Sequence, residues 1–148
     1  MGEMVTFPSN GHTCDGYLAG DGSGPGVIVI QEWWGLVPHI KDVADRFAAA
    51  GFTAMAPALF DPVQPDVELR YDQDGVARGR DYATSLGFER GLKIVGAASR
   101  WLHESGHAVA AVGFCWGGTL AMLANTRLHM ASVTYYGGRS VPFLGETA

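Results

Sequence analysis

The segment VAAVGFCWGG, at residues 109–118, constrains the fold of this chain more than any other. Its apolar first half leads to Cys115, with Gly113 two positions before the cysteine and Gly117 two positions after it. A nucleophile on a sharp turn between a strand and a helix needs glycine at both positions, because a Cβ there would collide with the neighbouring backbone. GxCxGG is the cysteine form of the GxSxG pattern. The segment therefore predicts a strand, a strained turn with Cys115 as nucleophile, and a helix.

Strand and helix patterns alternate along the rest of the chain. Residues 4–7 and 12–19 are predicted strands, and Asn10-Gly11 between them accepts the positive φ of a tight turn, which predicts a β-hairpin. Residues 27–30 are apolar on both faces, as in a strand covered by helices on each side. Further strands are predicted at residues 52–56, 109–114 and 131–136, and helices at residues 40–48, 88–102 and 117–127. This order predicts an α/β fold, with a mostly parallel sheet, helices on both faces and an N-terminal hairpin.

Composition narrows the range of partners. With 148 residues, of which 47% are hydrophobic, the chain is long enough for one domain with a sizeable core. Its formal charge of -5 argues against a nucleic-acid partner, which needs clustered positive charge. No apolar run approaches the roughly 20 residues of a membrane span, so we expect a cytoplasmic protein with a small-molecule substrate. The five histidines lack ligand spacing, and we expect no metal and no cofactor.

Two segments that follow predicted strands carry the candidate site. Glu32 and Trp33 follow residues 27–30, and Cys115 and Trp116 follow residues 109–114. In an open parallel sheet, ligands bind outside the carboxyl ends of the strands, so these residues are expected to meet there. We expect the backbone amides of Trp33 and Trp116 to form an oxyanion hole, in which one donor is typically worth about 2.7 to 4 kcal/mol.

The pairing of QEWWGL at residues 31–36 with GFCWGG at residues 113–118 resembles the dienelactone hydrolase family, an α/β-hydrolase group. The likeness runs through almost the whole chain, although Ala58 stands where many relatives carry an aspartate. The resemblance implies an α/β-hydrolase fold and hydrolysis of an ester or enol lactone through a thioester on Cys115, without metal or cofactor. It also implies that Glu32 contacts the resting thiol and takes part in its activation.

Residues 61–80 are rich in Asp, Pro, Gln, Arg and Gly, and we expect a long surface loop there. The family uses an arginine from this region to hold the carboxylate of the lactone. The resemblance therefore suggests Arg78 and Arg80 as substrate-binding residues. The alternative, that both are ordinary surface arginines, has equal weight.

The resemblance further implies a Cys-His-Asp triad, whose acid and histidine lie beyond residue 148 in the family. The residues after Cys115 contain no aspartate, one glutamate (Glu146) and one histidine (His129). His129 precedes a strand and is expected at the opposite edge of the sheet, roughly 20 Å from Cys115. His39, at a predicted helix start, is a candidate surrogate base. We therefore expect residues 1–148 to form a single, C-terminally truncated domain that lacks the last strands and helix of the fold.

Two other interpretations stay open. In the first, the chain is a catalytically incompetent fragment that self-associates through the exposed edge of residues 131–136. In the second, Cys115 belongs to a non-enzymatic module that senses oxidants or binds a small ligand, a role that needs the thiol but no triad.

Overall fold

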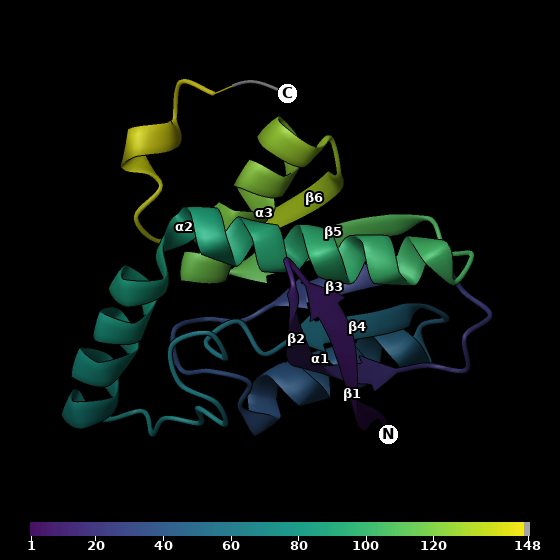
Figure 1. Ribbon diagram of the computed structural model, residues 1–148, viewed down its shortest axis with the longest axis horizontal. Helices are drawn as coiled ribbons and strands as arrows, with labels where there is room; N and C mark the ends of the chain where they lie inside the picture. Colours follow the sequence, from purple (N-terminus) through teal and green to yellow (C-terminus); the bar gives the residue numbers. More distant parts are fainter. Residues whose placement is uncertain (147–148) are drawn as a thin grey trace.

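The computed structural model describes residues 1–146, which form a six-stranded sheet between helices (Figure 1). The strands lie in the order β1-β2-β4-β3-β5-β6, with β1 and β2 antiparallel to their neighbours and β4, β3, β5 and β6 parallel. The strands are β1 (Glu3–Ser9), β2 (His12–Ala19), β3 (Gly26–Ile30), β4 (Thr53–Pro57), β5 (Val109–Phe114) and β6 (Ala131–Tyr135). The helices are α1 (Pro38–Ala49), α2 (Gln73–Glu104), α3 (Trp116–Leu128) and the 3-10 turn η1 (Val141–Phe143). The predicted α/β fold with its hairpin is confirmed.

The two faces of the sheet have separate cores. Side chains of β3 alternate between them, with Ile28 packing under α2 and α3 and Val29 packing against α1. All five residues of β3 are buried, because helices cover the sheet on both sides. The centre of the sheet is therefore filled by core side chains, and functional groups are left to the strand ends.

The hairpin has a two-residue turn. Asn10 and Gly11 have φ of 51° and 84°, and Ser9 pairs with His12 across the turn. Positive φ at both central residues matches the twist of the flanking strands, which explains the Asn-Gly sequence.

The structure corrects the expected loop at residues 61–80. Helix α2 begins at Gln73, where the Asp72 carboxylate accepts a hydrogen bond from the Gly75 N–H at 2.8 Å. Arg78 and Arg80 therefore lie on a helix. The sequence concealed this helix because its buried face is made of small residues, Gly75, Gly79 and Ala83, which give no apolar periodicity.

Gly87 divides α2 into two halves. Its φ of 75° and ψ of 162° interrupt the helix, and Figure 1 shows the half before it turning away from the half after it. The first half, residues 73–86, leaves the sheet, while the second half, residues 88–104, packs against it. A β-carbon would meet no atom within 4 Å at this position, so glycine is needed for its conformation alone.

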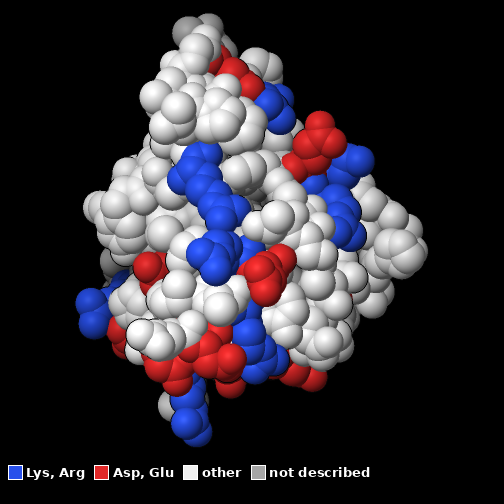
Figure 2. All heavy atoms as spheres, turned by 90° about the vertical axis from the view of Figure 1, so that its left-hand side faces the viewer, with Lys and Arg blue, Asp and Glu red and all other residues white. Residues whose placement is uncertain are grey.

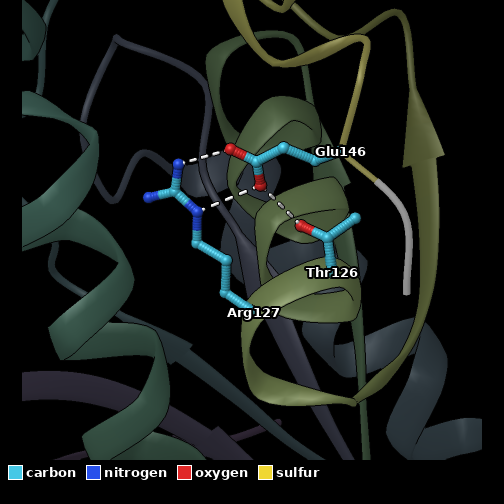
Figure 3. A network of polar contacts seen from close by, with 3 residues as sticks. All are labelled: Thr126, Arg127 and Glu146. Atoms are coloured by element: carbon cyan, nitrogen blue, oxygen red, sulfur yellow. Dashed lines mark hydrogen bonds and ion pairs between the residues drawn. The ribbon is translucent and has the colours of Figure 1, made fainter.

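The segment after β6 is attached to the far end of α3. The Arg127 guanidinium donates to both Glu146 carboxylate oxygens, from Nη2 at 2.6 Å and from Nε at 3.1 Å (Figure 3). The Thr126 hydroxyl donates to the same carboxylate at 3.1 Å. Glu146 is thus held about 10 residues along the helix from Cys115, roughly 15 Å away, and does not reach the sulfur.

Strand β6 forms an edge of the sheet. It pairs with β5 on one side only, and the side chains of Val133 and Tyr135 are 52% and 49% exposed. Within the described residues, no helix is long and apolar enough to cross a membrane.

Candidate active site

Cys115 occupies a strained turn between β5 and α3. Its φ of 56° and ψ of -121° are unfavourable for a residue with a side chain, and such backbone strain concentrates at functional sites. The Cys115 N–H donates to the Tyr135 carbonyl at 3.0 Å, and the Gly138 N–H donates to the Cys115 carbonyl at 2.7 Å. The turn is therefore held on both sides of the cysteine by β6 and the loop that follows it.

Glycines allow the close packing around this turn. A β-carbon on Gly113 would collide with the carbonyl of Gly117, and one on Gly117 would collide with the carbonyls of Gln31 and Ile30. On Gly118 it would lie 2.6 Å from the Tyr135 carbonyl oxygen. The GxCxGG pattern thus lets β3, β5, β6 and α3 meet behind the sulfur, as the sequence predicts.

The thiol of Cys115 is half-buried, and its surroundings shift its pKa. Burial raises its pKa above that of a free cysteine, the nearby backbone N–H of Trp116 lowers it, and the Glu32 carboxylate raises it again. The Trp116 ring itself is buried between Phe60 and Phe88, at centroid distances of 5.6 and 5.9 Å. The Trp116 backbone N–H therefore lies near the sulfur, while its ring belongs to the core.

Glu32 lies close enough to Cys115 for its carboxylate to raise the pKa of the thiol. Burial raises the pKa of the Glu32 carboxyl, and the imidazole of His39 partly lowers it. The Glu32 charge also affects two tyrosines. The pKa of Tyr71 is raised by burial and, to a smaller extent, by Glu32. The pKa of Tyr136 is raised by burial, then by Glu32 and Cys115. The structure thus brings Glu32 and Cys115 together and adds Tyr71 and Tyr136, which no sequence pattern identified as site residues.

The loop that carries Glu32 is held by its neighbours. The Leu59 N–H donates to Oε1 of the buried Gln31 at 3.2 Å, and the Leu69 N–H donates to the Trp34 carbonyl at 2.8 Å. The Nε2 atom of Gln31 has no hydrogen-bond partner among residues 1–146. These contacts hold the backbone on either side of Glu32 and Trp33, just after β3 ends at Ile30.

Arg139 is a further basic residue at this edge of the sheet. It follows Gly138, its guanidinium lies 5.9 Å from the Trp33 ring centre, and Nη1 donates to the Thr84 hydroxyl at 2.9 Å. It thus joins the loop after β6 to the loop after β3 and to α2. Its only sequence signal is its place three residues after a predicted strand, which was too weak to single it out.

The two arginines offered by the sequence lie on the exposed first half of α2. Arg78 donates to the Tyr82 hydroxyl at 3.3 Å and pairs with Asp74 at 3.9 Å, and Arg80 is exposed. Within residues 1–146, neither forms a hydrogen bond or ion pair with Cys115 or Glu32. Figure 2 shows basic side chains in a band down this face of the molecule, with acidic side chains gathered towards its lower end.

The histidines differ in their relation to the thiol. His129 has φ of 57° and caps the C-terminus of α3, so it lies at the end of that helix opposite to Cys115. His39, in the first turn of α1, lies near enough to Glu32 to stabilise its negative charge. Residues 1–146 contain no group of three or more metal-binding side chains.

Comparison with known proteins places this geometry in a family. The dienelactone hydrolase family matches residues 14–147. The chain is 37% identical over 147 residues to protein usf of Aquifex pyrophilus, with 93% of the chain and 62% of the relative covered. It is 34% identical over 142 residues to a proposed carboxymethylenebutenolidase of Synechocystis sp., with 90% and 58% covered.

A solved structure shows the same architecture. A Klebsiella pneumoniae protein, proposed to be a dienelactone hydrolase, superposes with a TM-score of 0.80 at 27% identity, over 93% of this chain and 60% of that one. The chain thus spans about 60% of the length of the proteins it matches. With a glycine-packed Cys115 turn, a neighbouring Glu32 and a match over most of its residues, the chain belongs to the dienelactone hydrolase family.

Proposed function

We propose that this chain carries the nucleophile of a hydrolase that acts on carboxylic esters or lactones. The observation that carries the proposal is the strained Cys115 turn, in which the Trp116 backbone N–H lies at the sulfur. Backbone strain of this kind concentrates at functional sites, and an amide at a helix N-terminus stabilises developing negative charge. Family membership supports the same reaction class.

The proposed chemistry is acyl transfer through a thioester. The Cys115 sulfur, after loss of its proton to a base, adds to the carbonyl carbon of the substrate, and the carbonyl oxygen becomes an oxyanion held by the Trp33 and Trp116 amides. The intermediate collapses with cleavage of the bond to the alcohol oxygen, which takes up a proton. Water then adds to the thioester, releasing the carboxylic acid and the thiol.

Glu32 is proposed to control when the thiol becomes reactive. Its negative charge and the burial of the sulfur keep Cys115 protonated, because both raise the pKa of the thiol. A substrate that displaces the carboxylate removes one of these two effects. As long as the carboxylate stays in place, Cys115 is protected from oxidation, because oxidation requires the thiolate.

The base for the first step is proposed to be a histidine, as the family resemblance implies. His39 lies near Glu32, since it lowers the pKa of that carboxyl, whereas His129 lies at the end of α3 opposite to Cys115. We propose His39 as a surrogate base in the isolated chain, and we expect acylation of Cys115 to be faster than hydrolysis of the thioester.

Recognition of an anionic substrate is proposed for the arginines near the site. Arg78 and Arg80 are the candidates from the sequence, and Arg139 is added because it lies against the Trp33 ring. A bidentate guanidinium contact is the usual way to bind a carboxylate. Changing each arginine to glutamine in turn shows which one binds substrate. Loss of the arginine that holds the carboxylate should raise KM for a lactone with a carboxylate more than KM for its methyl ester.

The test of the proposal is a stable acyl group on Cys115. The chain is mixed with p-nitrophenyl acetate, and release of one equivalent of p-nitrophenolate is followed together with peptide mass spectrometry. We expect acetyl on the peptide that contains Cys115, and the same result in the Cys14→Ser variant. Equal p-nitrophenolate release from Cys115→Ala, or an unmodified Cys115, would overturn the proposal.

The raised pKa of Cys115 argues against the role of an oxidant sensor. Sensor cysteines are thiolates at neutral pH and lie in electropositive surroundings, whereas Cys115 faces a carboxylate. The two free cysteines are consistent with a reducing compartment, and we propose a cytoplasmic location.

A further inference from the structure

A cavity lies away from Cys115, between the tip of the hairpin and the second half of α2. Its volume is about 480 Å³, which is within the range of small-molecule sites. The hairpin contributes Asn10, His12 and Thr13, and α2 contributes Arg90 and Lys93. Neither Cys115 nor Glu32 lines it. We propose that this cavity binds a small organic anion that carries hydroxyl groups, such as a polyol phosphate.

Two cations of α2 carry the first part of the argument. Arg90 and Lys93 lie three positions apart on the helix, and neither belongs to any ion pair formed among residues 1–146. The Arg90 guanidinium is already oriented, because Nε donates to the Leu86 carbonyl at 3.0 Å and Nη2 donates to the Ser85 carbonyl at 2.6 Å. A fixed guanidinium loses little side-chain entropy when an anion binds.

The charge of the cavity differs from that of the chain. The chain has five more acids than bases, yet this cavity holds two permanent cations, Arg90 and Lys93, against the single carboxylate of Asp61. The local excess of one positive charge favours an anion that is small enough to reach both cations.

The other polar groups of the cavity suit hydroxyl groups. The Asp61 carboxylate accepts a hydrogen bond from the Asp15 N–H through Oδ2 at 3.0 Å, and no described residue donates to its other oxygen. That oxygen accepts from a hydroxyl and repels a second anionic group. Thr13 and Asn10 add a hydroxyl and an amide to the same cavity. The anion is therefore expected at Arg90 and Lys93, with the hydroxyl groups towards Asp61.

The test is a titration of the whole chain, labelled with ¹⁵N, with glycerol 3-phosphate, followed by NMR. We expect the amide signals of His12, Thr13 and Lys93 to shift on binding, and those of Trp33 and Trp116 to stay in place. Glycerol is expected not to bind, and inorganic phosphate is expected to bind more weakly. The readout is binding, so it does not depend on hydrolysis by Cys115.

Two charge-removing variants test the contact. Lys93→Gln is expected to weaken binding by roughly tenfold, the loss of one hydrogen bond between charged groups. Arg46→Gln, exposed on α1 and outside this cavity, is expected to change the dissociation constant less than about twofold, since distant exposed charges are screened. Equal affinity in Lys93→Gln and the parent chain, shifts confined to other residues, or equal affinity for inorganic phosphate would overturn the proposal.

Discussion

The two cysteines of this chain show how differently one residue type is used. Cys14 is 3% exposed in the regular ladder of β2, where it pairs with Phe7 of β1. Cys115 is half-buried on a turn with positive φ, outside any strand or helix ladder. Burial is the largest cause of a raised pKa in both thiols. Burial alone therefore does not separate the structural cysteine from the proposed nucleophile.

The difference lies in what surrounds each sulfur. At Cys14, the Ser9 hydroxyl lowers the pKa of the thiol, and Asp61 and Asp15 raise it. At Cys115, the stabilising donor is the backbone N–H of Trp116, at the start of a helix, where a developing anion is stabilised most. A donor fixed by the backbone, together with strain at the residue itself, marks the site.

The largest expected effect is on acyl transfer. Cys115→Ser should lower the rate of p-nitrophenolate release from p-nitrophenyl acetate by about a thousandfold or more, because the nucleophile is replaced by a much weaker one. Cys14→Ser should change that rate less than about twofold. Stopped-flow absorbance measures both, and a similar loss in the two variants would remove the distinction between the cysteines.

A glycine two residues from each cysteine extends the comparison to stability. Gly113→Ala brings a β-carbon against the Gly117 carbonyl, which belongs to the backbone, so we expect the free energy of unfolding to fall by about 3 kcal/mol. Gly16→Ala meets the Met55 sulfur at 2.6 Å, and this flexible side chain moves aside at a loss of about 1 kcal/mol. Urea unfolding measures the two values; a reversed order would mean that the Cys115 turn is not tightly packed.

Each cysteine also has a carboxylate that raises the pKa of its thiol, Glu32 at Cys115 and Asp61 at Cys14. Glu32→Gln removes a charge that raises the pKa of Cys115, so alkylation of Cys115 by iodoacetamide at pH 7 should become roughly severalfold faster, with Cys14 unchanged. Asp61→Asn should speed only Cys14, because Asp61 acts on that thiol. Peptide mass spectrometry reports both rates. Unchanged reactivity of Cys115 in Glu32→Gln would contradict the assigned role of Glu32.

The same variant predicts a pH dependence of stability. Burial raises the pKa of Glu32 in the folded state, so its contribution to stability is complete below the unfolded pKa of about 4.3 and is lost as pH rises through the folded pKa. Glu32→Gln should therefore be more stable than the parent chain at pH 7, and the difference should shrink towards pH 4. Urea unfolding at the two pH values checks this; a difference that grows at pH 4 would contradict it.

The smallest effect concerns β6, which supports Cys115 but not Cys14. The outer edge of β6 is unpaired within residues 1–146, and we propose that it allows self-association. Val133→Lys should weaken that association by roughly threefold, because a charge opposes edge pairing, whereas Val76→Lys on α2 should not. Sedimentation velocity over a range of concentrations measures it. A parent chain that stays monomeric at all concentrations would contradict the proposal.

Local patterns predicted most of the fold. Asn10-Gly11 has the positive φ of a tight hairpin, and the buried run at residues 27–30 is the central strand. These features follow from sequence because φ preferences and strand periodicity act over a few residues. The loop predicted at residues 61–80 was wrong for residues 73–80, which begin α2, since Gly79 and its small neighbours pack without an apolar stripe.

The sequence by itself determined that Cys115 sits on a turn that only glycines permit, because that requirement is written within a few positions of the residue. Only the tertiary structure decided what faces the sulfur and the Glu32 carboxylate. Tyr71, Tyr136 and Arg139 come from different parts of the chain, and their proximity to the site is created by the sheet order and the break in α2. Contacts between distant segments depend on packing, which no local pattern encodes.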